Sequence, residues 1–101
     1  MNDLVAEVVS TIAEAIRPEK VILIGSQARG EAAPDSDIDL VIVYSGPESK
    51  RDLKLRIRGL FPRQSFSMDI LVLTPDEFRR EQEVANSAGR IAAREGVVCY
   101  G

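Results

Sequence analysis

The spacing of apolar residues changes from helical to strand-like within the first part of the chain. From Asp3 to Arg17 apolar side chains recur at helical spacing, which is typical of an amphipathic helix with one buried face. Pro18 cannot donate a backbone hydrogen bond, so this helix is expected to end there. The run from Lys20 to Ile24 is short, apolar and rich in β-branched residues, which predicts a strand buried on both faces.

The same alternation continues through the middle of the chain. Residues 25–36 contain glycine, proline and several small side chains, which predicts a loop with one helical turn near residues 27–31. Residues 38–44 form the next expected strand, residues 48–61 a second amphipathic helix, and residues 68–73 a third strand.

The last part of the chain begins with a strong helix-start signal. Thr74 is placed as an N-cap, and Glu77 three residues later closes a capping box. The helical segment is expected to break near residues 86–89, to end at the cap Gly96, and to be followed by an edge strand over residues 97–100. This order of elements predicts an α/β (α+β) fold in which a small mixed β-sheet is flanked by helices.

Composition limits both the size of the fold and its chemistry. A chain of 101 residues holds a single domain, expected to span residues 1–101, and 45% hydrophobic with 29% charged residues is typical of a soluble globular protein. The absence of histidine from the sequence excludes histidine-based catalytic triads and histidine zinc sites. The single cysteine, Cys99, excludes a disulfide framework and is expected to be a small packed side chain. Catalysis would therefore depend on carboxylates, hydroxyls, guanidinium groups and the backbone.

Charge and hydropathy narrow the partners and the compartment. With 16 acidic and 13 basic residues the net charge is −3, which disfavours direct binding to nucleic acid. The apolar runs are too short to cross a membrane, the N-terminus lacks the order of a signal peptide, and the thiol is free, which together predict a cytoplasmic protein. A local basic cluster is either a solvated helix face or a surface that steers an acidic partner; its members are Lys50, Arg51, Lys54, Arg56, Arg58 and Arg63.

Three aspartates are the candidates for metal chemistry. Asp37 and Asp39 are two residues apart, so on a strand they share one face, with Cα atoms about 6.6 Å apart. Asp37 taken alone is more simply explained as a turn or capping residue; as a set, the aspartates favour a functional site. Asp69 begins the third strand, where an unpaired carboxylate among apolar residues is costly. Three such carboxylates repel one another unless a cation lies between them, and oxygen-only ligands suit magnesium or manganese.

Gly25 and Ser26 follow the first strand directly. Glycine lets the backbone approach a ligand closely, and the amides of a following helical turn attract phosphate, to which the Ser26 hydroxyl adds a donor. Taken alone, a Gly-Ser pair after a strand is usually a plain turn, and it lacks the lysine of a Walker loop. Together with the three carboxylates it indicates a metal-assisted site for a nucleoside triphosphate.

The spacing of these residues resembles a known signature. Gly25-Ser26, ten further residues and Asp37-Ile38-Asp39 are similar to the Gly-Ser-x10-Asp-x-Asp motif of the DNA polymerase β-type nucleotidyltransferase superfamily. The fuller text, Gly25-Ser-x-Ala-Arg-Gly30 through Ser36-Asp-x-Asp-Leu40, resembles the minimal nucleotidyltransferases, prokaryotic proteins of similar length that pair with helical HEPN-family toxins. The resemblance extends over nearly the whole chain and includes Asp69.

This resemblance implies a role for each matched residue. Asp37 and Asp39 would hold two magnesium ions, and Asp69 would complete one of the metal sites. Gly25 and Ser26 would hold the β- and γ-phosphates of ATP. Asp69 or a metal-bound hydroxide would take the proton of the attacking hydroxyl.

Arg29 has two interpretations. It would add positive charge to the phosphates, or it would form a salt bridge with Glu31 or Asp35.

The resemblance also implies an activity and a partner. It implies a polymerase β-type fold and an enzyme that transfers AMP from ATP to a hydroxyl of a HEPN toxin. The acceptor that it implies is a tyrosine hydroxyl. The chain would then be the antitoxin of a toxin–antitoxin pair and part of a hetero-oligomer. The alternatives are an antitoxin that neutralises its toxin by binding alone, and nucleotidyl transfer to a small molecule such as an aminoglycoside.

Overall fold

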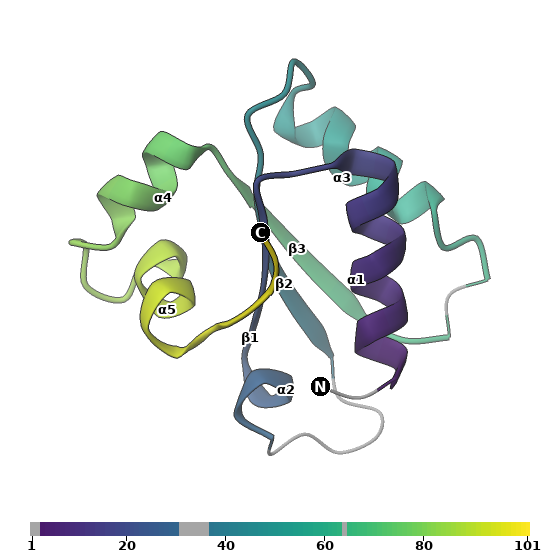
Figure 1. Ribbon diagram of the computed structural model, residues 1–101, viewed down its shortest axis with the longest axis horizontal. Coiled ribbons are helices and arrows are strands. Elements are labelled where there is room, and N and C mark those ends of the chain that lie inside the picture. Colours follow the sequence, from purple (N-terminus) through teal and green to yellow (C-terminus); the bar gives the residue numbers. More distant parts are fainter. Residues whose placement is uncertain (1–2, 31–36, 64) are drawn as a thin grey trace.

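Helices cover both faces of a four-stranded sheet in the computed structural model, which describes residues 3–30, 37–63 and 65–101 (Figure 1). The elements in chain order are α1 (Asp3–Ile16), β1 (Lys20–Ile24), α2 (Ser26–Arg29), β2 (Ile38–Val43), α3 (Lys50–Gly59), β3 (Met68–Leu73), α4 (Pro75–Glu81), α5 (Ala88–Glu95) and β4 (Val97–Tyr100). This confirms the predicted α/β arrangement with a small mixed sheet. Among the described residues, no helix combines the length and the apolar character needed to span a membrane.

The strand order β3-β2-β1-β4 places β1 and β2 in the centre of the sheet. β1 runs antiparallel to both β2 and β4, whereas β2 and β3 are parallel. A parallel pair needs a long crossover connection, and α3 provides it here. The strands are in register such that Ile24 pairs with Asp39 and Asp39 pairs with Asp69.

Two hydrophobic clusters lie on opposite faces of the sheet. The larger lies between the sheet and the helices α1 and α3, and it includes Val21 and Leu23 of β1. The smaller lies between the other face and α4 and α5, and it includes Ile22 of β1. Neighbouring side chains of β1 therefore enter different clusters, which confirms the predicted burial of this strand on both faces. The residues of the smaller cluster are Ile22, Val41, Val43, Leu73 and Ala92, with Ile24 and Phe78 packed against them.

Most helix ends lie within two residues of the predicted positions. α1 ends at Ile16 instead of Arg17, because the residue before a proline is disfavoured in the helical region and Arg17 adopts a left-handed φ of 51°. α3 covers residues 50–59, a shorter range than the predicted 48–61. The Ser49 side chain accepts a hydrogen bond from the Asp52 amide and so fixes its start. The predicted turn over residues 27–31 is α2, which begins at Ser26 and ends at Arg29.

The C-terminal elements confirm the predicted cap and the predicted break. Thr74 accepts a hydrogen bond from the Glu77 amide, and the Glu77 carboxylate accepts one from the Thr74 amide, which completes the capping box. α4 ends at Glu81 and α5 begins at Ala88, so the break lies slightly earlier than residues 86–89. β4 pairs antiparallel with β1 at the sheet edge, as predicted.

Gly96 follows α5 as predicted, but its backbone is extended (φ −76°, ψ 161°) and not left-handed. The reason for a glycine is close packing. A Cβ at this position would lie 2.5 Å from the carbonyl oxygen of Ala92 and 2.5 Å from Cγ2 of Ile22. Glycine therefore allows the chain to pass directly over β1 as it enters β4.

Candidate active site

Asp39 and Asp69 lie side by side on neighbouring strands. They are directly paired in the parallel β2–β3 register, so their side chains project from the same face of the sheet. Asp39 is half-buried in the second position of β2, and Asp69 is exposed in the second position of β3. The structure thus places the third strand beside the second, which brings Asp69 next to Asp39.

The exposure of Asp69 corrects one sequence argument. An unpaired carboxylate in an apolar strand is costly only when it is buried, and Asp69 lies on an outer strand in contact with solvent. Its desolvation penalty is therefore small. What distinguishes Asp69 is its position opposite Asp39, not the energy of burying it.

Asp37 precedes β2 by one residue and is exposed, so it belongs to the segment leading into the strand. Its charge still acts on Asp39. Burial raises the pKa of the Asp39 carboxyl above its ordinary value of 3.8, and the negative charges of Asp69 and then Asp37 raise it further. Both neighbouring carboxylates are therefore close enough to disfavour ionisation of Asp39.

Gly25 brings the first strand up to these carboxylates. Its φ of 78° and ψ of −160° lie in a region that only glycine adopts readily. A Cβ on residue 25 would lie 2.6 Å from Oδ2 of Asp39. The missing side chain therefore leaves space for the Asp39 carboxylate against the backbone at the end of β1.

The short helix α2 continues from this contact. The amides of Ala28 and Arg29 donate to the carbonyl oxygen of Gly25, which closes the turn after β1. Ser26 is half-buried and Arg29 is exposed. Glu31 and Asp35, the two predicted salt-bridge partners of Arg29, lie outside the described residues. The predicted nucleotide-binding residues thus lie on one short segment next to Asp39.

The donor set fits a hard divalent cation. The candidate ligands are carboxylate oxygens, with no sulfur or imidazole among them, and such ligands suit magnesium or manganese. Within residues 3–30, 37–63 and 65–101, no three acidic or cysteine side chains are already arranged to hold a metal ion.

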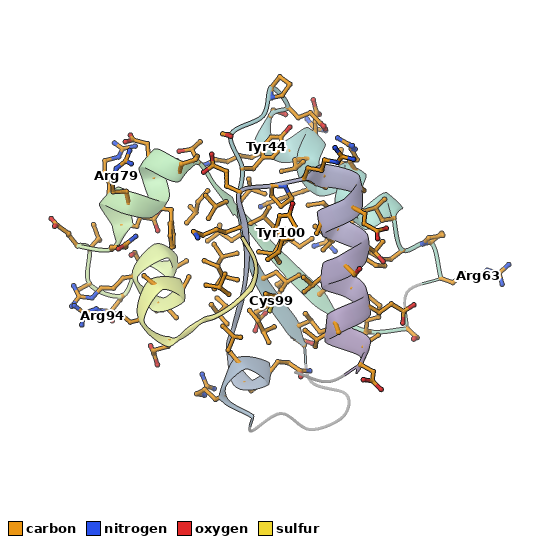
Figure 2. All side chains as sticks on the ribbon, viewed as in Figure 1. Tyr44, Arg63, Arg79, Arg94, Cys99 and Tyr100 are labelled. Atoms are coloured by element: carbon orange, nitrogen blue, oxygen red, sulfur yellow. The ribbon has the colours of Figure 1, made fainter. Side chains whose placement is uncertain are left out.

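Other sequence candidates lie away from this cluster. Lys50 of the basic cluster pairs with Glu77, and Arg56 pairs with Glu48 and donates to the carbonyl oxygen of Ala15. Both stabilise the fold. Arg63, by contrast, points away from the rest of the molecule (Figure 2).

Cys99 is partly buried against the larger cluster, as expected, and burial raises the pKa of its thiol. It lines a hollow of about 590 Å³ between α1 and β4 that contains none of the site carboxylates.

Two features of the site were not predicted from the sequence. The contact between Gly25 and Asp39 depends on the antiparallel register of β1 and β2, which residue spacing does not reveal. Leu71, two residues after Asp69, is partly exposed on the same face of β3. The two-residue period of a strand would have shown that Leu71 accompanies Asp69.

Known proteins share the sequence pattern and the fold of this chain. The profile of the nucleotidyltransferase domain family matches residues 5–65. A candidate nucleotidyltransferase from Sulfolobus solfataricus has 27% sequence identity and a TM-score of 0.58, over 94% of this chain and 75% of its own. The structure of a candidate minimal nucleotidyltransferase has 27% identity and a TM-score of 0.56, over 93% of this chain and 90% of its own. No match is found among curated proteins.

A further similar structure is a chain of a toxin–antitoxin crystal structure with AMP-PNP. Its TM-score is 0.63 at 15% identity, over 95% of this chain and 73% of its own, which establishes a likeness of fold alone.

The family profile spans more than half of the chain and includes Gly25, Ser26, Asp37 and Asp39, whereas Asp69 lies beyond it. The chain therefore belongs to the nucleotidyltransferase domain family. Within that class, its fold neighbours agree with the resemblance to the minimal nucleotidyltransferases.

Proposed function

We propose that this chain transfers AMP from ATP to a hydroxyl of a partner protein, a helical HEPN-family toxin, and so acts as its antitoxin. The observation that carries the proposal is the convergence of Gly25, Asp39 and Asp69 at one end of the sheet. Family membership supports a nucleotidyl transfer, and the carboxylates supply the chemistry that such a transfer needs.

The nucleotide would bind over the end of β1. Gly25 and Ser26 would hold the β- and γ-phosphates, because the backbone there is free of a side chain and the Ser26 hydroxyl is a donor. Arg29, on the same short helix, would add positive charge. A triphosphate held there would place its α-phosphorus toward the aspartates at the start of β2.

Asp37, Asp39 and Asp69 would hold two magnesium ions, or manganese, which when bound neutralise negative charge on the entering and leaving oxygens. Burial raises the pKa of Asp39, and the negative charges of Asp69 and Asp37 raise it further. The second contribution supports this role, because a cation relieves repulsion between like charges.

The proposed reaction is a single displacement at phosphorus. The acceptor oxygen forms a bond to the α-phosphorus, the bond from that phosphorus to the α–β bridging oxygen breaks, and pyrophosphate leaves. Asp69, on the acceptor side, takes the hydroxyl proton, because the chain has no histidine to do so. A tyrosine of the toxin is the acceptor that the resemblance implies.

The partner part of the proposal depends on the small size of the sheet. Four strands and their helices leave the outer side of Asp69 exposed, so a bound partner would position the acceptor and lower the entropic barrier. The same fold occurs in a toxin–antitoxin structure with AMP-PNP, which supports a hetero-oligomer of this kind. A reducing cytoplasm, expected from the free thiol, belongs to the same proposal.

The test uses the protein encoded beside this chain as acceptor and ATP labelled at either the α- or the γ-phosphate. Nucleotidyl transfer labels the acceptor from α-labelled ATP alone, and only when magnesium is present. Label from the γ-position would indicate a kinase. A stable complex that gains no label from either nucleotide would favour the binding-only antitoxin.

A further inference from the structure

The catalytic face of β3 carries an exposed aliphatic residue beside Asp69. Leu71 is two residues further along the strand, so it projects from the same face, with its Cα about 6.6 Å from that of Asp69. Leu73, the next residue on this face, is 4% exposed, whereas Leu71 is 36% exposed.

The exposure of Leu71 results from where the helices end. Ile22, Val41 and Leu71 form one row across β1, β2 and β3, and the first two are buried in the smaller cluster. α4 leaves the sheet from the far end of β3, beyond Leu73, and together with α5 it does not cover the start of that strand (Figure 1). The β3 end of this row, next to the carboxylates, is therefore open to solvent. At the other end Val98 of β4, which pairs with Ile22, is also exposed, but it lies at the opposite edge of the sheet, away from the carboxylates.

The strand order gives this opening a direction. The proposed phosphate-binding residues follow directly after β1, and Asp39 lies on β2. Asp69 and Leu71 lie on the outer strand β3. A triphosphate over β1 and β2 leaves the outer edge of β3 as the side from which an acceptor approaches. An acceptor hydroxyl that reaches Asp69 across this face of β3 has Leu71 beside its attached group.

We propose that Leu71 is a positioning residue for the acceptor and that it packs against an aliphatic or aromatic group next to the acceptor hydroxyl. This inference rests on the proposed function. β3 from Met68 to Leu73 contains no lysine or arginine, so this strip offers no cation to the phosphates of a polynucleotide. The basic residues of α3 belong to the helical layer on the opposite face of the sheet. The arginines on the face of Leu71 lie on α4 and α5, which do not cover the start of β3, and those of α4 pair with Asp76. The surface favours an apolar protein segment as the carrier of the hydroxyl.

Leu55 provides a matched control. It is 60% exposed, more than Leu71, but it lies on α3, whose buried residues enter the larger cluster on the opposite face. Substitution to threonine suits position 71, because a β-branched residue is favourable on the edge strand β3. The same substitution at position 55 makes the same change of side chain, there on a helix. The measurement is AMP transfer from ATP to the protein encoded beside this chain, with KM for the acceptor and for ATP determined separately.

Leu71→Thr is expected to raise KM for the acceptor about tenfold, as expected for losing the contact of one aliphatic side chain, and to leave KM for ATP unchanged. Leu71→Met is expected to restore the acceptor KM, and Leu55→Thr to leave it unchanged. An unchanged acceptor KM in Leu71→Thr would overturn the inference, as would efficient transfer to the 3′ hydroxyl of an oligonucleotide that does not depend on Leu71.

A second measurement does not require catalysis. A photo-crosslinking p-benzoylphenylalanine in place of Leu71 is expected to capture the neighbouring protein, and the same residue in place of Leu55 is not. Capture from position 55 alone, or from neither position, would overturn the inference. If the wild-type chain captures its partner from position 71 but transfers no AMP, the proposed function fails and the contact at Leu71 stands.

Discussion

The Asp39 carboxylate occupies the space that a side chain on Gly25 would fill, with Oδ2 2.6 Å from the position of the missing Cβ. This contact joins the turn after β1 to the carboxylates of β2 and β3. Glycine is needed after the first strand for two physical reasons. It adopts the unusual backbone conformation, and it leaves space for Asp39.

Gly25→Ala is expected to abolish AMP transfer and to destabilise the fold by about 1–3 kcal/mol, because it adds both backbone strain and a clash with Asp39. Gly30→Ala is the control. Gly30 also has a positive φ, 72°, but nothing lies within 4 Å of its missing Cβ. It is expected to lose about 1 kcal/mol of stability and to retain most of the activity. Equal loss of transfer in both variants would show that the contact with Asp39 is unimportant.

Asp39→Asn is expected to stabilise the metal-free protein near neutral pH, by about 0.5 kcal/mol or less, while abolishing transfer. The pKa of Asp39 is raised in the folded state, so protonation favours the fold below pH 3.8, and this contribution is lost as the pH rises through the raised pKa. The stabilising effect of the substitution should therefore be present at pH 7 and fade below pH 4. Thermal melts in EDTA measure it. When magnesium and ATP are added, the wild-type chain should become more stable than Asp39→Asn, since only the wild-type chain gains stability from binding them.

Glu77→Gln is expected to lower stability at pH 7 by about 0.5 kcal/mol, because it removes the ion pair with Lys50, whereas glutamine still accepts the hydrogen bond from the Thr74 amide in the capping box of α4. The hydrogen bond from Lys50 and the one from the Thr74 amide lower the pKa of Glu77 to about 2. Stability from a lowered carboxyl pKa is present above the ordinary value of 4.5 and is lost as the pH falls toward 2. The melting temperatures of wild type and variant should converge over that range. Glu83→Gln, in the turn after α4, serves as the control.

Two helix-end glycines are expected to respond to alanine in opposite directions. Gly96→Ala places a Cβ against the Ala92 carbonyl and Ile22, so a loss of about 1–3 kcal/mol is expected. Gly59→Ala, in α3, meets nothing within 4 Å and is expected to add about 0.5–1 kcal/mol through helix propensity. Chemical denaturation measures both. A neutral Gly96→Ala would mean that the close approach of the chain to β1 relaxes without strain.

Local sequence patterns predicted most elements of the fold because each depends on contacts near in sequence. Proline, capping residues and the period of apolar positions located the helices, and the strands over 20–24, 68–73 and 97–100 have the predicted bounds. Deviations occur where longer contacts decide. Gly96 is the predicted cap of α5, but its need for glycine comes from close packing against Ile22, which is distant in the sequence.

The candidate site was predictable in its residues but not in its assembly. Spacing indicated Asp37, Asp39 and Asp69, whereas the opposition of Asp39 and Asp69 follows from the parallel register of β2 and β3. That register depends on which strands pair with each other, and the sequence alone does not reveal this pairing. The exposure of Leu71 was likewise hidden, because it depends on where α4 and α5 stop covering the sheet.

The most direct measurement is the intact mass of the protein encoded beside this chain after incubation with ATP and magnesium. With the wild-type chain, the partner is expected to gain the mass of one or more AMP units. With the Asp37→Asn/Asp39→Asn double variant, the complex is expected to form at the same stoichiometry and the partner mass to stay unchanged. A partner that gains AMP equally with the double variant would contradict the role of the carboxylates. A partner that gains no mass with either chain, yet is neutralised equally by both, would contradict nucleotidyl transfer and leave binding alone as the function.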